Sequence, residues 1–248
     1  KGMPMNLDYA EKLQSQSTFL GVIKPEEAET LYLDLARFRK LLDAYDIRLK
    51  VDNESGIEAW NKLPNSKKIE TAANFKKYVD LSCELHDAGI SLRNNRAVLT
   101  NALSRLGFTL GFSNADFIEN DHLVEIYSLD NLQIFRSINF FDYCNYTMLE
   151  LLSCEWFVLY ERLESITKTI FAEVKLSIES QQMTKLAVPT HIMQERFSNP
   201  RGVFEINHQF CCPIFDAEKK LVAFVANLEV RELDVIGAQE SNLSFLGN

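Results

Sequence analysis

Glycine, proline and histidine are scarce in this chain of 248 residues, which holds 9 Gly, 6 Pro and 4 His. Together with 46% hydrophobic and 25% charged residues, that scarcity excludes a collagen-like or disordered chain and is typical of a folded globular protein. The length suits one large domain or two small ones.

Long apolar runs and a regular cysteine pattern are also lacking. No apolar stretch approaches the roughly 18 to 20 residues that span a bilayer, and the first residues contain no signal-peptide core. The 5 cysteines stand at irregular spacing, which indicates reduced thiols rather than a disulfide framework. We therefore expect a cytoplasmic protein without membrane insertion.

Basic residues are outnumbered in one half of the chain. Residues 1–120 hold 16 Lys and Arg against 17 Asp and Glu, whereas residues 121–248 hold 10 against 18, a net charge of -8. An acidic surface repels phosphate backbones, so we expect no nucleic-acid partner. Four lysines form the most basic cluster, which we interpret as a solvated helix face: Lys67, Lys68, Lys76 and Lys77.

The first half of the chain has helical patterns. Pro25 suits the first position of a helix, and apolar residues recur after it at helical spacing up to Tyr45. A short helix is predicted around 57–63, and a longer one from Ser66 to Gly89 with Ile69, Ala73, Tyr78 and Leu85 facing inward. A further helix is predicted over 95–106, with Gly107 as its C-cap.

The second half alternates strands and helices. Residues 122–141 predict a β-hairpin around the turn Leu129-Asp130-Asn131. Short helical pieces are predicted over 146–152 and 156–160. A clear helix follows over 162–182, with an apolar stripe of Ile166, Ile170, Val174 and Ile178, and then a loop at Pro189. A long closing hairpin ends the pattern. In it, one face is expected to be buried: Phe210, Cys212, Ile214, Leu221, Ala223 and Val225.

These patterns predict an α+β protein. We expect a mainly helical region over residues 1–115, an antiparallel sheet with flanking helices over 116–236, and a flexible tail over 237–248. The boundary near residue 115 rests on the change from helical to strand patterns and on the change in charge.

Several segments of the second half resemble a PAS domain, whose order is a hairpin, short helices, a longer helix and a long hairpin. The segment 130–134 resembles the first turn and second strand of that family, and Asn139 stands where the family often has an asparagine. The segment 145–152 resembles its short helix, and 213–222 its last hairpin. A GAF domain, which also ends in long antiparallel strands, is the alternative. The resemblance implies a sensory or interaction domain and, in many members, homodimerisation.

Two groups of residues are candidates for a chemical site. His86-Asp87 resembles the doublet of metal-dependent phosphohydrolases, but few other histidines are present to complete a metal site, and we expect His86 to face solvent at a helix end. On a regular strand, His208 shares a face with Cys212 but lies roughly 13 Å from it, and Cys211 faces the other side. We interpret the cysteines as small packing residues and expect no catalytic and no metal-binding residues.

No cofactor is expected either. The segment around Cys144 does not resemble the flavin-adduct motif of light-sensing PAS domains, and the predicted helix over 162–182 has no histidine for haem. Core packing is the favoured role of the aromatic residues near 156–160. As candidates to line a ligand pocket or a partner surface, the sequence offers Trp156, Phe157, Tyr160, Phe210 and Cys212.

Three hypotheses of function remain open. The first is a non-enzymatic bacterial-type sensory or regulatory protein that acts through protein partners, with or without a small ligand. The second is a structural adaptor subunit of a larger bacterial assembly, such as a secretion-system coupling complex. The third, weaker one is a degenerate His-Asp phosphohydrolase built on His86 and Asp87.

Overall fold

The computed structural model describes residues 25–50, 54–111, 118–131 and 133–233. Its helices are α2 (Pro25–Asp43), α3 (Glu54–Lys62), α4 (Asn65–Asp87), α5 (Asn95–Leu106), α6 (Phe140–Tyr143), α7 (Met148–Ser153), α8 (Trp156–Leu159) and α9 (Glu164–Ser180). Its strands are β1 (Thr109–Leu110), β2 (Leu123–Ser128), β3 (Gln133–Arg136), β4 (Tyr160–Glu161), β5 (Thr184–Lys185), β6 (His191–Glu195), β7 (Val203–Phe215) and β8 (Leu221–Glu232). The chain is therefore an α+β protein, as predicted.

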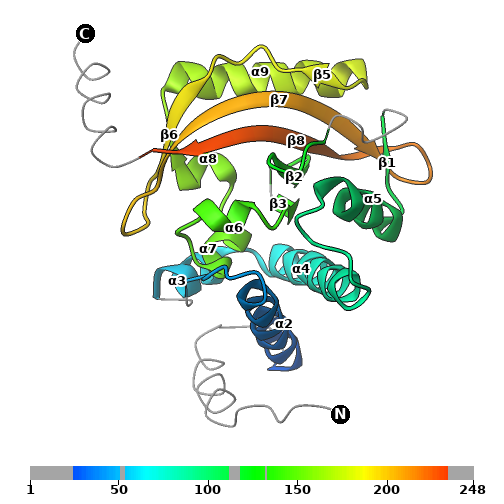
Figure 1. Cartoon of the computed structure of the whole chain (residues 1–248), viewed down its shortest axis with the longest axis vertical. Coiled ribbons are helices and arrows are strands. Elements are labelled where there is room, and N and C mark those ends of the chain that lie inside the picture. Colours follow the sequence, from blue (N-terminus) through cyan, green and yellow to red (C-terminus); the bar gives the residue numbers. More distant parts are fainter. Residues whose placement is uncertain (1–24, 51–53, 112–117, 132, 234–248) are drawn as a thin grey trace.

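One curled antiparallel sheet organises the second half (Figure 1). Its strand order is β3-β2-β8-β7-β6-β4, and the short strands β1 and β5 also pair with β7. The long hairpin β7-β8 lies in the middle of the sheet, and the predicted hairpin β2-β3 turns at Asn131, which has a positive φ of 65°. The order of elements, a hairpin, short helices, the longer helix α9 and a long hairpin, is the predicted one.

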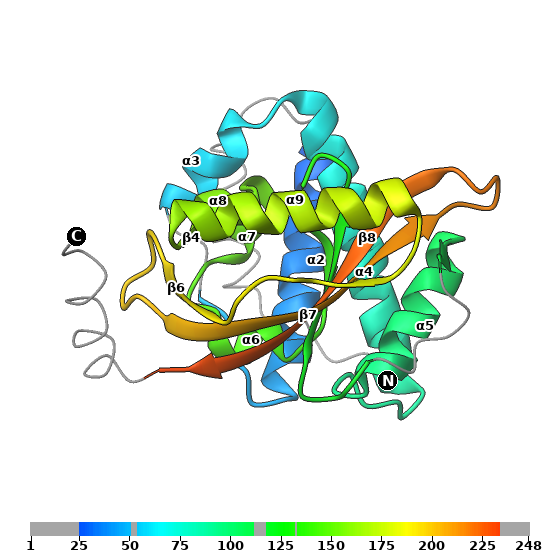
Figure 2. The ribbon, with the colours of Figure 1, turned by 90° about the horizontal axis from the view of Figure 1, so that it is seen from above.

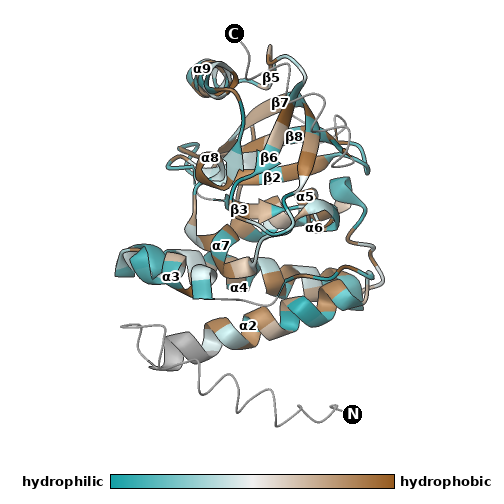
Figure 3. Cartoon of the chain, turned by 90° about the vertical axis from the view of Figure 1, so that its left-hand side faces the viewer, coloured by the Kyte–Doolittle hydropathy of each residue, from teal (hydrophilic) through white to brown (hydrophobic). Residues whose placement is uncertain are grey.

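Helices cover both faces of the sheet (Figures 1 and 3). Helix α9 crosses one face, where it runs over β7 and β8 (Figure 2). The predicted apolar stripe of α9 packs on that face, with Ile170 buried and Ile166, Val174 and Ile178 half-buried. The other face is covered by helices of the first half of the chain, with α2 farthest from the sheet (Figure 3). The second face contributes alternate strand residues to the main core: Val124, Ile126, Phe135, Cys212, Ile214, Ala223 and Val225.

Two predicted helices of the first half match the structure closely. Helix α2 begins at Pro25, and apolar residues of its stripe are buried: Leu31, Leu35, Phe38 and Leu42. Helix α5 spans the predicted residues and ends at Gly107, which adopts the left-handed conformation with φ of 69°. An αL C-cap of this kind favours glycine, because a side chain would be strained there.

The inward face predicted for α4 is wrong at two positions. Ile69 is 54% exposed and Ala73 is exposed, whereas the buried stripe runs through Phe75, Val79 and Ser82. Ala73 stands two residues before Phe75, and a helix turns about 100° per residue, so the two side chains point to opposite sides. The helix also begins without a side-chain cap from Ser66, because Pro64 precedes its first turn.

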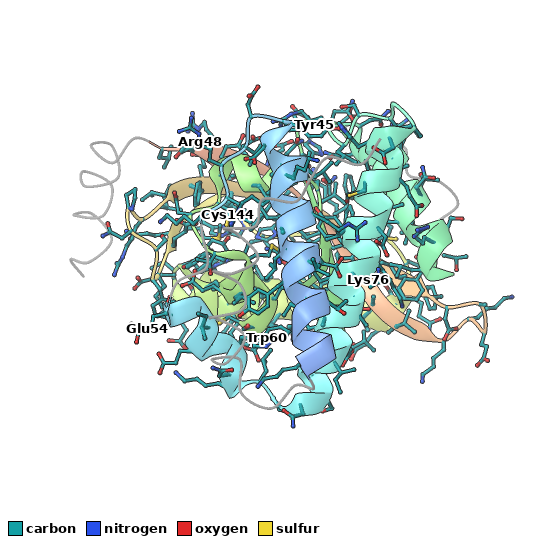
Figure 4. All side chains as sticks on the ribbon, turned by 90° about the horizontal axis from the view of Figure 1, so that it is seen from below. Tyr45, Arg48, Glu54, Trp60, Lys76 and Cys144 are labelled. Atoms are coloured by element: carbon teal, nitrogen blue, oxygen red, sulfur yellow. The ribbon has the colours of Figure 1, made fainter. Side chains whose placement is uncertain are left out.

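A single core connects the helical half to the sheet. It reaches from Leu31 on α2 to Val225 on β8 and includes Trp60, which is completely buried. The Tyr78 hydroxyl of α4 donates a hydrogen bond to the Arg136 carbonyl of β3 at 2.8 Å. Figure 4 shows this side of the molecule, with α2 in front and Lys76 on the neighbouring α4.

The predicted division into two units stays a prediction. Its boundary near residue 115 and the tail 237–248 lie outside the described residues. Of the four clustered lysines, Lys67 pairs with Glu70 and Asp130, and Lys76 pairs with Asp80, whereas Lys68 is buried. No described helix combines the length and the apolar character that crossing a membrane would need.

Candidate functional site

A cavity of about 80 Å³ lies between α9 and the sheet. Residues of β2, β6, β7 and β8 form its floor, and α6, α8 and α9 form its walls. A single water needs only ~10 to 15 Å³ of such space, so this cavity has room for a small organic group. Most of its lining is apolar, and the following polar side chains interrupt it: Glu125, Tyr127, Asn131, Tyr143, Tyr160, Arg162 and His208.

Glu125 is a buried carboxyl group in the middle of β2. It accepts hydrogen bonds from the Tyr127 hydroxyl at 2.7 Å and from the Gln133 side-chain amide. Burial raises the pKa of Glu125, although these two donors and the charge of Arg136 oppose the shift. Both carboxyl oxygens of Glu125 thus already have protein donors.

Arg162 is the cation of the cavity. Its guanidinium lies 4.9 Å from the Trp156 ring centroid, and one terminal nitrogen lies 2.8 Å from the Met193 sulfur. Its Nε is shielded from solvent and has no hydrogen-bond partner, and no described carboxylate lies within ion-pair distance. Burial lowers the pKa of Arg162 to about 10, so the group stays charged at neutral pH.

His208 adds an unpartnered imidazole nitrogen. It is 8% exposed, and its Nε2 has no hydrogen-bond partner in the described structure. Burial, together with the charges of Arg162 and His191, lowers the pKa of His208 to about 3. The ring is therefore neutral at pH 7, and in one of its two tautomers Nε2 is a hydrogen-bond donor.

A β-bulge decides which side chains of β7 reach the cavity. His208 pairs with Leu228 and Phe210 with Asn227, so Gln209 is an extra residue in the strand. Beyond the bulge the faces are exchanged. Cys211 packs on the α9 side with Ala226, and Cys212 belongs to the opposite core. The prediction that His208 shares a face with Cys212 is thus wrong, because it assumed a regular strand.

The predicted lining residues are distributed over several places. Trp156 and Tyr160 line the cavity, and Phe157 packs against the Trp156 ring at 5.5 Å between centroids. Phe210 is half-buried at the bulge, and Cys212 lies on the far face of the sheet. The closing hairpin has a face that the sequence predicts to be buried. Cys212 of that face is buried, whereas Phe210 and Leu221 are only half-buried.

The cysteine thiols are protonated at neutral pH. Burial raises the pKa of Cys144, at the cavity wall, to about 12, that of Cys211 to about 12 and that of Cys212 to about 11. A nucleophilic cysteine needs the opposite shift, so these groups pack as small apolar side chains.

His86 lies at the C-terminal end of α4, exposed as predicted. Its Nδ1 lies 3.4 Å from the Tyr45 hydroxyl. Over the described ranges, no cluster of three or more His, Cys, Asp or Glu side chains is placed to hold a metal ion.

The sequence prediction missed the polar residues of the cavity: Glu125, Arg162 and His208. One signal was present for Glu125, a charged residue inside the apolar run Leu123 to Tyr127. An ionisable residue at an inward strand position is costly and therefore informative. Arg162 gave no comparable signal, since the orientation of a residue just before a helix cannot be predicted from periodicity. For His208, alternation along the strand does not tell which face of the sheet borders a cavity.

Comparison with known proteins assigns no family to this chain. No family model and no curated protein match it. Among solved structures, it is similar to the PAS domain of a protein from Colwellia psychrerythraea. The two chains share 16% sequence identity over 48% of this chain and 89% of that chain, with a TM-score of 0.34. A TM-score of this size is too low to assign the fold family.

Proposed function

We propose that this chain is a non-enzymatic regulatory protein of bacterial type whose PAS-like second half binds a small molecule and acts through a protein partner. The cavity beneath α9 carries this proposal, because it combines a predominantly apolar wall with a few polar groups that lack partners, which is typical of ligand pockets. The order of elements and the segments that resemble a PAS domain support it.

Helix α9 is the element through which binding would act. Ile170, Phe171 and Val174 contribute to the cavity wall, while Ile170 and Ser177 are the residues of this helix that are fully buried. The Ser177 hydroxyl donates a hydrogen bond to the Cys211 carbonyl at 3.1 Å and holds one end of the helix on β7. A ligand that favours one position of α9 over another shifts the equilibrium between them.

Exposed apolar side chains near α9 are suited to a protein partner. Phe171 is 37% exposed on the helix, Leu163 is 48% exposed just before it, and Phe197 is 60% exposed in the adjoining β6-β7 turn. The backbone hydrogen bond from Arg196 to Leu159, at 2.9 Å, connects that turn to α8. Apolar surface of this kind favours binding of a partner, a second copy of the chain included.

The same surface supports a structural adaptor as the second candidate. An adaptor would use the fold as a rigid platform, and its partner would bind independently of the cavity. The two candidates therefore differ in one respect: whether a change inside the cavity alters partner binding at the surface.

Native mass spectrometry of the full chain tests ligand binding. We expect a species heavier than the bare chain by one small molecule, and we expect Ala226→Met, which fills the cavity, to remove it. A bare-chain mass for the wild type, together with no rise in melting temperature across a library of apolar small molecules, would contradict ligand binding.

Affinity capture with partner identification separates the two candidates. A regulatory protein is expected to bind its partner differently in Ala226→Met, whereas an adaptor would bind it equally well. The surface variant Phe197→Ser should weaken capture in both cases, with Arg201→Ser at an exposed position of the same turn as its matched control. Absence of any stoichiometric partner would count against both candidates.

A further inference from the structure

The cavity contains one cation, Arg162, that has no carboxylate at ion-pair distance among the described residues. Arg162 lines it as a cation, its Nε has no partner, and no described carboxylate pairs with it. Glu125 lines the same cavity and favours the charged form of Arg162 from beyond ion-pair distance, but Tyr127 and Gln133 already donate to its two oxygens. A buried cation without a contacting counterion is costly, and an anion bound next to it would offset that cost.

A second donor is available beside the cation. His208 lines the cavity, its buried Nε2 has no hydrogen-bond partner among the described residues, and the imidazole is neutral at pH 7. In the Nε2-protonated tautomer it donates one hydrogen bond without adding charge. Arg162 thus offers the N–H donors of a planar guanidinium, and His208 offers one further N–H donor. A carboxylate, with two acceptor oxygens, is suited to this combination of donors.

The rest of the cavity wall is apolar, so a ligand that fills it needs an apolar body. Its wall includes Leu186 and Phe224 of the small α9-side core, and Trp156 and Phe171 lie with ring centroids 5.2 Å apart at its aromatic side. A highly charged anion such as a phosphate would leave most of its oxygens facing these side chains without donors. A single carboxylate on an aliphatic or aromatic body fits both parts of the cavity.

We propose that the cavity is a site for an apolar monocarboxylic acid, bound as the carboxylate with Arg162 as its counterion and His208 as its second donor. This inference rests on the proposed ligand-binding function and specifies the chemical class of the ligand. The apolar body contacts α9 through Ile170, Phe171 and Val174, so its size determines how far the helix is displaced.

Matched acid and amide pairs test the inference on the full-length wild type. Isothermal titration calorimetry would compare butyrate, hexanoate, octanoate and phenylacetate with the primary amide of each. We expect at least one carboxylate to bind about tenfold or more tightly than its amide, because the charged hydrogen bonds are lost in the amide. This comparison needs no variant.

Two variants and a control test whether Arg162 and His208 are the groups that recognise the carboxylate. Arg162→Met keeps an unbranched stem against Trp156 and is expected to abolish the preference for the acid while the amide still binds. Arg201→Met, at an exposed arginine of the β6-β7 turn, is the matched control and should keep the wild-type preference. His208→Phe should weaken carboxylate binding by about threefold to tenfold.

The outcomes separate this inference from the proposed function. If the amides bind as tightly as the acids, or if Arg162→Met keeps the preference, the ligand class is wrong and the cavity remains a site for neutral molecules. If no acid and no amide binds, and no other small molecule is retained in native mass spectrometry, the ligand-binding function itself is wrong.

Discussion

His191 and His208 lie with their imidazole rings stacked, 5.4 Å apart between centroids and 12° between planes. They come from the neighbouring strands β6 and β7, and each has a buried Nε2 without a hydrogen-bond partner among the residues that the structure describes. The Nδ1 of His191 lies 3.0 Å from the Pro189 carbonyl, which can only accept, so this nitrogen holds the proton of the neutral ring. Two stacked rings beside Arg162 disfavour any further positive charge.

Stability is therefore expected to fall in mild acid. Burial, with the charges of Arg162 and His191, lowers the pKa of His208 to about 3, against about 6.5 in an unfolded chain. The unfolded state binds the proton first, so the contribution of His208 is complete above about pH 6.5 and is lost progressively as the pH falls toward 3. Between pH 7 and about pH 5 the free energy of unfolding should decrease by about 2 kcal/mol from this group alone.

Urea unfolding at the two pH values checks this expectation. His208→Phe keeps an aromatic ring opposite His191 and cannot titrate, so its loss of stability between pH 7 and about pH 5 should be about 2 kcal/mol smaller than that of the wild type. Burial raises the pKa of Glu125, but this group titrates in both proteins. Its contribution therefore cancels when the two pH dependences are compared. Equal pH dependence in the two proteins would show that His208 is not buried as a neutral ring.

Ala226 and Ala223 provide a matched pair on the two faces of β8. Ala226 lines the cavity, whereas Ala223 is fully buried in the main core on the other face. A methionine at 226 extends into existing space, so Ala226→Met should change the free energy of unfolding by less than about 1 kcal/mol. A methionine at 223 overpacks a filled core, and Ala223→Met should cost about 1 to 3 kcal/mol. Chemical denaturation of both variants measures the difference, and equal costs would contradict the presence of open space beneath α9.

Periodic patterns predicted much of the fold. The stripe of α2, the C-cap at Gly107 and the apolar stripe of α9 depend on local rules of helix geometry and capping, and each is found in the structure. The turn at Asn131 is of the same kind. These features are decided within a few residues of sequence.

Other features depend on contacts between distant residues. Where the sequence predicts a loop at Pro189, strand β6 follows; its sequence His191 to Glu195 does not alternate, and the strand is held by pairing with β7 and the short β4. The bulge at Gln209 places Cys211, and not Cys212, on the same face as His208, and no local signal marks it. Arg162 reaches the cavity because α8, β4 and α9 meet there. Of the residues that line the cavity, the sequence therefore predicted only aromatic ones, Trp156 and Tyr160.

Glu195 is a fully buried carboxylate that ties the β6-β7 turn to the segment before α7. Its Oε1 accepts from the Asn145 backbone at 2.8 Å, and its Oε2 accepts from the Asn145 side chain at 3.0 Å, the Ser198 hydroxyl at 2.6 Å and the Gly202 backbone at 2.8 Å. Glu195→Gln replaces one acceptor by a donor, so at least one buried N–H or O–H loses its partner. The free energy of unfolding should decrease by about 2 to 3 kcal/mol.

The exposed residue Glu179 on α9 is the control for that variant. Its ion pair with Lys175 spans 3.6 Å and is solvent-exposed, so Glu179→Gln should change stability by less than about 0.5 kcal/mol. Urea titrations at pH 7 compare the two. A cost for Glu195→Gln as small as the control would show that the carboxylate is not required for the turn.

Gly202 is the position where β7 begins beside a crowded ring. A Cβ placed there would lie 2.3 Å from Cζ of Phe204 and 3.0 Å from Oε2 of Glu195. Phe204 is 2% exposed and lines the cavity, so its ring can yield only by moving into that space. We expect Gly202→Ala to decrease the free energy of unfolding by about 1 to 3 kcal/mol and to weaken ligand binding as well, because the displaced ring occupies the cavity.

A double-mutant cycle with Phe204→Leu tests this explanation. The smaller leucine side chain relieves the clash, so the cost of Gly202→Ala should fall by at least about 0.5 kcal/mol in the Phe204→Leu background. Strict additivity of the two changes would mean that the ring is not what excludes a side chain at position 202.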